Sequence, residues 1–110
     1  MHRILFVCHG NICRSPMAEM VMKHLVKERG AEKDFFIDSA ATTHDAIGCR
    51  IHRGTRDALA RHQIPFGEHH ARIVAARDYA DFDLIVVMDG ANLRNTLRVF
   101  GSDPEGKVSL

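Results

Sequence analysis

The sequence predicts an α/β fold, with a parallel sheet flanked by helices, and three observations lead to this prediction. Short apolar runs alternate with segments of helical periodicity along the whole chain. Residues 4–7 and 84–88 are continuous apolar runs, the pattern of strands buried on both faces. A polar, glycine-containing loop joins the first of these runs to a helix start at Ser15-Pro16, and such loops lie at the carboxyl ends of parallel strands.

The elements follow from local patterns taken in order along the chain. The first helix has Ser15 as its predicted N-cap, ends near Gly30, and carries an apolar stripe at Ala18, Val21, Met22, Leu25 and Val26. Strands are predicted at 35–37 and from 107 onward, helices at 54–62 and 91–99, one helical turn at 78–81, and an irregular stretch at 40–53. This alternation favours right-handed crossovers within one sheet.

Length and composition limit the class of protein. A chain of 110 residues with 45% hydrophobic and 26% charged residues predicts a single domain over residues 1–110. The formal net charge of +1 gives no overall field that would attract nucleic acid or an anionic membrane, and no apolar run is long enough to span a bilayer. The first residues do not resemble a signal peptide, so the three cysteines are expected to be free thiols in a reducing, cytoplasmic compartment.

The loop after the first strand combines the residue types that phosphate binding and thiol chemistry need. It is formed by Cys8, His9, Gly10, Asn11, Ile12, Cys13, Arg14 and Ser15. Backbone N–H groups of such a loop and the following helix N-terminus surround an anion, and the planar fork of Arg14 holds two phosphate oxygens. These positive surroundings favour a thiolate at Cys8, to which Ser15 can donate a hydrogen bond. Gly10 is expected to permit close backbone approach, and Asn11 to adopt a left-handed conformation.

The segment from Val7 to Glu19, VCHGNICRSPMAE, resembles the signature of low-molecular-weight protein tyrosine phosphatases. Further matches in the same order occur at Ser39-Ala40, Gly48, Ile51-His52-Arg53-Gly54-Thr55, His69, Ala71-Arg72, Met88-Asp89 and Asn92-Leu93. The resemblance implies a four-stranded parallel sheet with flavodoxin-like layering. It also implies hydrolysis of a phosphotyrosine protein or an aryl phosphate through a cysteinyl-phosphate, without metal or other cofactor, and inhibition by oxyanions such as phosphate or vanadate.

The resemblance also implies roles for individual residues. Cys8 corresponds to the nucleophile and Arg14 to the phosphate clamp of the family. The hydrogen-bond network that holds the loop corresponds to Asn11, Ser15, Ser39 and His69. Cys13 corresponds to a second cysteine that can trap an oxidised nucleophile as a disulfide, and its alternative interpretation is a small packing residue.

The first departure from the family concerns its general acid, an aspartate in a D-P-[YW] loop that follows the last strand. This sequence ends at Leu110, before such a loop and the last helix, so we expect a domain shortened at its C-terminus. Activity is then expected to be impaired, most of all for leaving groups that need a proton. A truncation, an omitted tail or a homodimer that covers the exposed face would each account for the short chain. Asp103-Pro104 precedes the last strand and is predicted to be a surface turn.

The second departure concerns the wall of the pocket. Many family members have a tryptophan where this chain has Asp45, and the chain contains no tryptophan. An aromatic sandwich for a tyrosine ring is therefore not visible in the sequence, and Asp45 would repel a dianion if it faced the pocket. His9 and Ile12 are the remaining candidates for the lip of the pocket.

Three alternative functions are compatible with parts of the sequence. A non-catalytic phosphate- or phosphoprotein-binding module would need the loop but no acid. Arsenate reduction is less favoured, because the related enzymes use further cysteines downstream and this chain has only Cys49 there. A metal site built from Cys49, His52, His69 and His70 is not expected, because the spacing matches no zinc pattern. The loop also lacks the G-x4-G-K-[ST] pattern of ordinary nucleotide binding.

Overall fold

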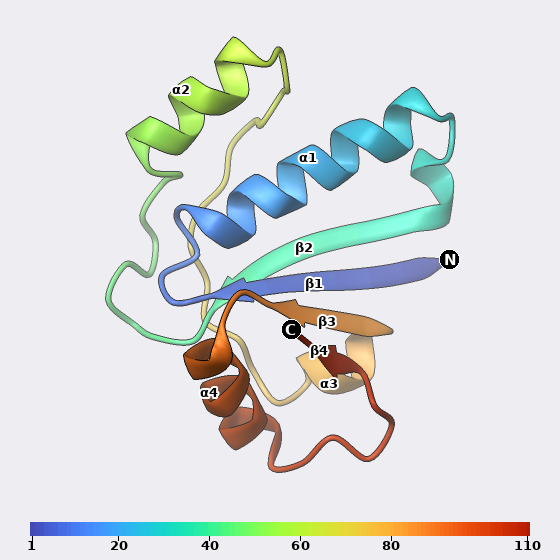
Figure 1. Cartoon of the computed structure of the whole chain (residues 1–110), viewed down its shortest axis with the longest axis vertical. Coiled ribbons are helices and arrows are strands. Elements are labelled where there is room, and N and C mark those ends of the chain that lie inside the picture. Colours follow the sequence, from blue (N-terminus) through green and yellow to red (C-terminus); the bar gives the residue numbers. More distant parts are fainter.

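A four-stranded sheet in the order β2-β1-β3-β4 forms the centre of the computed structural model, which describes residues 1–110 (Figure 1). The strands are β1 (His2–Cys8), β2 (Phe35–Ala41), β3 (Leu84–Val87) and β4 (Val108–Ser109). Every neighbouring pair is parallel, and Cys8 at the end of β1 is in register with Ala41 at the end of β2. The predicted α/β fold with a four-stranded parallel sheet is therefore confirmed.

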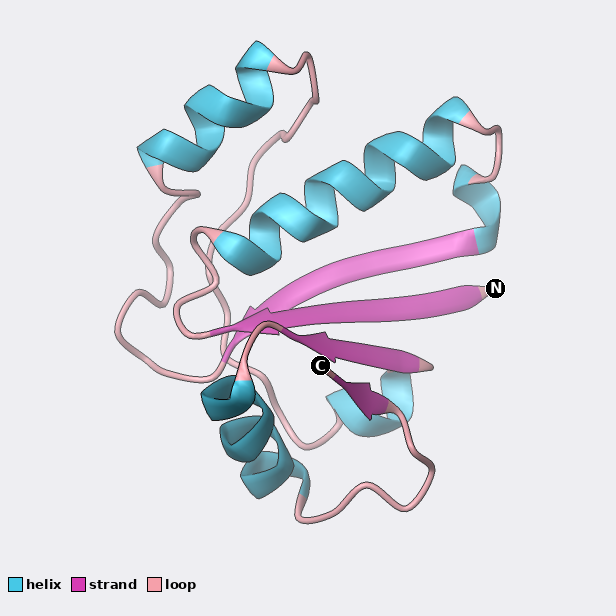
Figure 2. Cartoon of the chain, viewed as in Figure 1, coloured by secondary structure: helices cyan, strands magenta, loops and turns pink.

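Helices cover both faces of this sheet. Figure 1 shows α1 (Arg14–Glu28) and α2 (Arg53–Arg61) on one face, and α3 (Asp78–Asp81) and α4 (Gly90–Phe100) on the other. A short 3-10 turn, η1 (Glu32–Asp34), leads into β2. Figure 2 shows that the loops that follow β1, β2 and β3 lie together at the carboxyl ends of these strands, where parallel sheets bind ligands. None of the helices is long and apolar enough to cross a membrane.

The alternation of side chains along the strands builds the main core. Leu5 and Val7 of β1 are fully buried and pack with Ile85, Val87 and Phe82 on the face that α3 and α4 cover. A second, smaller cluster forms between the two helices of the other face, from Met20, Ile51 and Leu59. The main core therefore packs directly against the strand that ends in Cys8.

The predicted apolar stripe of α1 is not its buried face. The buried residues are Ser15, Pro16, Glu19 and Met20, whereas Leu25 of the predicted stripe remains 40% exposed. The helix also starts at Arg14 with Cys13 as its N-cap, not with Ser15. Both corrections have one cause. The Ser15 hydroxyl bonds groups of the Cys8–Ser15 loop and the Glu19 carboxylate bonds Ser39, so both polar side chains are buried. Hydrophobic periodicity instead assigns such polar side chains to the exposed face.

β2 is the other element whose extent differs from the prediction. It continues to Ala41 instead of ending at residue 37, because its entire length pairs with β1. The remaining helices and strands lie within two residues of their predicted limits, and the single turn predicted at 78–81 is α3.

The Asp103-Pro104 segment is a turn before β4, as expected. Asp103 Oδ1 accepts hydrogen bonds from the Tyr79 hydroxyl at 2.7 Å and from the Lys107 N–H at 2.8 Å, and its Oδ2 accepts from the Val108 N–H at 3.2 Å. These donors, the Tyr79 hydroxyl above all, hold the pKa of Asp103 below its ordinary value of 3.8. Because β4 is parallel to β1, this turn lies at the opposite end of the sheet from Cys8.

The lowered pKa predicts how Asp103 contributes to stability as the pH changes. The ionised carboxylate stabilises the fold above its unfolded pKa of about 3.9, and this contribution is lost as the pH falls through the lower folded value. We expect Asp103→Asn to lower the free energy of unfolding near neutral pH, with the difference from the unmutated chain narrowing as the pH falls below about 3.9. Urea unfolding across this range measures the effect, and Asp34→Asn, an exposed carboxylate of η1, is the control. A constant difference at all pH values would contradict the assignment.

Candidate active site

The loop from Cys8 to Ser15 lies at the carboxyl ends of the strands, between β1 and α1. Cys8 is only 3% exposed, and its thiol has two polar neighbours: the Ser15 Oγ at 3.0 Å and the Asn11 N–H at 3.3 Å. The Asn11 side-chain amide donates to the same Ser15 oxygen at 2.8 Å, which leaves the hydroxyl proton free to point at the sulfur. The Asn11 N–H and the Ser15 hydroxyl are thus both placed to donate to the Cys8 sulfur.

Asn11 connects this loop to the segment that crosses the end of β2. It has a φ of 58°, as expected for a left-handed residue, and it is fully buried. Its Oδ1 accepts from the Arg72 N–H at 3.2 Å, and its backbone oxygen lies 3.2 Å from His69 Nε2. Because a carbonyl oxygen can only accept, Nε2 of His69 carries a proton and donates it to this bond.

Two replacements of Asn11 distinguish the free-energy cost of the left-handed backbone from the cost of losing the hydrogen bonds of its side-chain amide. We expect Asn11→Gly to lower the free energy of unfolding by about 1–3 kcal/mol, since the Arg72 N–H and the Ser15 hydroxyl lose buried partners. Asn11→Ala should cost about 1 kcal/mol more, because a Cβ disfavours the left-handed conformation. Gln63 has the same φ of 58° but is exposed, so Gln63→Gly and Gln63→Ala provide the matched control for strain alone. Equal stability of the two Asn11 variants would contradict the strained geometry.

Glu19 is a supporting residue that the sequence analysis did not single out. Its carboxylate is buried, accepts hydrogen bonds from the Ser39 Oγ and, at 2.6 Å, from Lys23 Nζ, and lies 3.8 Å from His69 Nδ1. Ser39 and His69, both predicted as loop support, therefore meet at this one carboxylate. The available signal was the place of Glu19 in the matched segment, four residues after Ser15 and hence on the same face of α1.

Arg14 is held by a carboxylate from the end of β3. Its Nη1 lies 3.0 Å from Asp89 Oδ2, and both side chains are about half exposed. Asp89 also caps α4 by accepting from the Asn92 N–H at 2.8 Å, and this bond, followed by that with Arg14, holds the pKa of Asp89 below 3.8. Asp89 is therefore ionised at neutral pH, so that it orients the guanidinium and has no proton to donate to a leaving group. The guanidinium has five N–H donors and keeps others for an anion.

Cys13 and Gly10 differ in part from what the sequence suggested. The Cys13 thiol is exposed at the start of α1 and accepts a hydrogen bond from the Thr55 hydroxyl of α2 at 3.1 Å, so it is not a packing residue. A Cβ at Gly10 would meet Ile12 Cγ1 at 3.7 Å and Ala46 Cβ at 3.8 Å, which are ordinary contacts, and its φ is not left-handed. The structure therefore gives no steric reason for glycine at this position.

The histidines considered as metal ligands have other partners. His52 Nδ1 accepts from the Gly54 N–H and caps α2, His69 contacts Asn11 and Glu19, and His70 Nδ1 lies 2.9 Å from the Gly48 oxygen. No group of three or more potential ligands is assembled anywhere in the chain.

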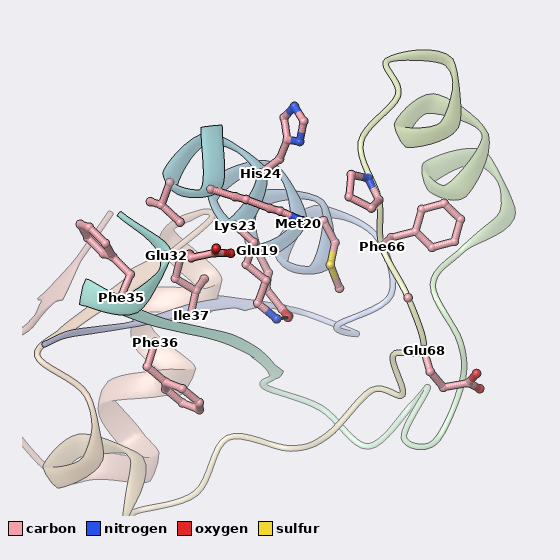
Figure 3. Close-up of a pocket in the computed structure, with 14 residues that line it drawn as sticks. Glu19, Met20, Lys23, His24, Glu32, Phe35, Phe36, Ile37, Phe66 and Glu68 are labelled. Carbon is pink, nitrogen blue, oxygen red and sulfur yellow. Dashed lines mark hydrogen bonds and ion pairs between the residues drawn. The ribbon is translucent and has the colours of Figure 1, made fainter. Parts of the chain in front are cut away.

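A separate hollow of about 570 Å³ lies between α1, β2 and the segment 65–68 (Figure 3). Met20, Ile37 and Phe66 contribute apolar walls, and Lys23 of α1 reaches Glu19 at its edge. The hollow does not include any residue of the Cys8–Ser15 loop. The candidate site is therefore not this hollow but the surface around the Cys8–Ser15 loop, which we call the rim.

The fold and the loop together define a class: α/β proteins with a Cys-x5-Arg loop at the carboxyl end of the first parallel strand. Residues 3–110 match the sequence model of the family described as low molecular weight phosphotyrosine protein phosphatase, and the chain belongs to this family.

Individual family members agree with this assignment. The human low molecular weight phosphotyrosine protein phosphatase is 43% identical over 95 residues, which cover 86% of this chain and 60% of the relative. YfkJ of Bacillus subtilis, a low molecular weight protein-tyrosine-phosphatase, is 44% identical over 93 residues, covering 84% and 60%. The crystal structure of YfkJ superposes with a TM-score of 0.95 over 99% of this chain and 69% of that one. The chain thus spans about 60% of the length of the first of these curated relatives.

Proposed function

We propose that this chain is the part of a protein tyrosine phosphatase that holds the nucleophile and the phosphate site, and that its substrates are phosphotyrosine proteins or aryl phosphates. The observation that carries the proposal is the pair of donors aimed at the buried Cys8 sulfur, from Ser15 and from the Asn11 backbone, on the loop that ends in Arg14. The family to which the chain belongs supports the same reaction class.

The proposed reaction has two steps and uses no metal. In the first, the Cys8 thiolate attacks phosphorus, an S–P bond forms, the P–O bond to the aryl group breaks, and the leaving oxygen takes up a proton from solvent. Backbone N–H groups of the loop and the Arg14 guanidinium stabilise the charge on the three phosphoryl oxygens. In the second step, water attacks phosphorus and gives up a proton to solvent, the S–P bond breaks, phosphate leaves, and the Ser15 hydroxyl stabilises the released thiolate.

We further propose that Cys13 is the redox partner of Cys8 and that the chain functions in a reducing, cytoplasmic compartment. The supporting observations are that all three cysteines are free and that Cys13 is exposed on the same loop as the nucleophile. The thiolate chemistry needs a reduced Cys8, which a reducing compartment maintains.

Hydrolysis of an activated aryl phosphate tests this function. We expect turnover by the 110-residue chain that is insensitive to a metal chelator and competitively inhibited by vanadate, which occupies the phosphate position as an oxyanion. We also expect this chain to hydrolyse activated aryl phosphates faster than phosphotyrosine, because their leaving groups need less protonation. Turnover that the chelator abolishes, or vanadate binding without any turnover, would contradict the proposal; the second result is what a non-catalytic binding module predicts.

A further inference from the structure

The wall of the candidate site next to Cys8 is a polar loop that is attached to the phosphate loop through His9. The Thr43 N–H and the Thr43 hydroxyl both donate to the His9 backbone oxygen, at 3.2 and 3.1 Å. His9 Nε2 lies 2.9 Å from Asp45 Oδ2. The two loops therefore lie side by side, as the left side of Figure 1 shows, and the contact with His9 places Asp45 beside the phosphate loop.

Asp45 has a free oxygen at this rim. Only its Oδ2 has a partner, and its side chain is 73% exposed, so Oδ1 faces solvent. His9 can donate to it as a neutral imidazole and adds a positive charge only when it is protonated. An ionised carboxylate next to a dianionic phosphoryl group is unfavourable unless a cation accompanies the substrate.

Three arginines of this end of the molecule are already paired with carboxylates. Arg14 pairs with Asp89 at 3.0 Å, Arg50 lies 3.9 Å from Glu68, and Arg53 lies 3.9 Å from Asp57. Among the carboxylates bonded to the loop or its wall, Asp89 and Glu19 each use both oxygens. Asp45 is therefore the carboxylate of the rim that has no arginine or lysine partner and an oxygen to spare.

We propose that Asp45, held by His9, is a specificity-determining residue that selects phosphotyrosine segments with a lysine or arginine directly beside the phosphorylated residue. This inference rests on the proposed phosphatase function and names the substrate class of the same site. A basic side chain at that position would reach the free oxygen of Asp45 and offset its repulsion of the phosphate. The His9 bond sets the position of the carboxylate, and His9 acts only through Asp45.

Matched phosphotyrosine peptides that differ only in having lysine or glutamate beside the phosphotyrosine test the inference. The quantity is the ratio of kcat/KM for the lysine peptide to that for the glutamate peptide, because a ratio cancels changes in basal activity. We expect Asp45→Asn to lower this ratio about two- to fivefold, the scale of an exposed ion pair, and Asp45→Lys to lower it further. Asparagine still accepts the His9 hydrogen bond, so loop attachment is kept. Asp34→Asn, the same charge change on η1, should leave the ratio unchanged.

A binding measurement separates failure of this inference from failure of the proposed function. In the Cys8→Ser background, fluorescence anisotropy with the same two peptides reports recognition without turnover. If hydrolysis is absent but the affinity ratio falls on Asp45→Asn, the catalytic proposal fails and the selection stands. If the ratio is the same in Asp45→Asn as in the unmutated chain, by turnover and by binding, the inference is overturned. Loss of the difference at high salt is expected, because exposed charges are screened.

Discussion

Cys8→Ser is expected to lower the rate of aryl phosphate hydrolysis by about 10⁴-fold or more, the scale on which loss of a covalent nucleophile acts in hydrolases. The Ser15 hydroxyl and the Asn11 N–H both lie within hydrogen-bond distance of the Cys8 sulfur and are placed to donate to it. A serine hydroxyl has nearly the same size but stays protonated at neutral pH, so the loop keeps its anion site and loses its nucleophile. In Cys8→Ser, steady-state hydrolysis should therefore be lost while the affinity for vanadate is kept.

Cys49→Ser is the matched control for this prediction. Cys49 is exposed and has no side-chain hydrogen bond, so its replacement should change neither activity nor the free energy of unfolding. Equal losses in the two variants would show that the activity depends on thiols in general and not on Cys8. Retention of activity in Cys8→Ser would contradict the assignment of Cys8 as the nucleophile.

Arg14→Lys is expected to lower kcat/KM about 10²–10³-fold, although the positive charge is kept, because a donor to transition-state oxygens is lost. The guanidinium offers a planar fork to two phosphoryl oxygens while it is oriented by Asp89, whose Oδ2 lies 3.0 Å from Nη1. An ammonium group on a flexible stem has no such fork and would be drawn onto Asp89. We expect vanadate affinity to fall together with kcat/KM, since both depend on the same clamp.

Arg61→Lys controls for loss of an arginine in general, because Arg61 is an exposed residue in the last turn of α2. It should leave both quantities unchanged. A loss in Arg14→Lys that is confined to KM, with kcat and vanadate affinity unaltered, would show that Arg14 attracts substrate and does not clamp the transferred group.

The sequence predicted the parts of the fold that local pattern determines. Continuous apolar runs marked β1 and β3, because strands buried on both faces cannot carry polar side chains. The loop from Cys8 to Ser15 was also visible, since its residue types and their spacing are local. The left-handed Asn11 follows from the same local chemistry, and its φ of 58° agrees.

Contacts between distant segments were not predictable in the same way. Glu19 is buried because Ser39, 20 residues away, and His69 both meet its carboxylate, and no pattern within α1 shows this. The stripe assigned to α1 was wrong for that reason. The Thr55–Cys13 bond joins residues 42 positions apart, and the Arg14–Asp89 pair joins residues 75 apart.

Asp45 illustrates how much a single partner changes an interpretation. From the sequence alone it was a charge that would repel a dianion, with no account of how such a residue is accommodated in the wall. The His9 contact at 2.9 Å supplies that account: the histidine fixes one carboxylate oxygen and leaves the other for a cationic group of a substrate.

Trapping the covalent intermediate tests the central claim, that the Cys8 thiolate attacks phosphorus, most directly. The 110-residue chain is mixed with an activated aryl phosphate, quenched rapidly in acid, and analysed by intact-mass and peptide mass spectrometry. The account predicts a single phosphoryl adduct on the peptide that contains Cys8, absent in Cys8→Ser and present in Cys49→Ser. Turnover of the substrate with no adduct on Cys8, or with an adduct on another residue, would contradict it.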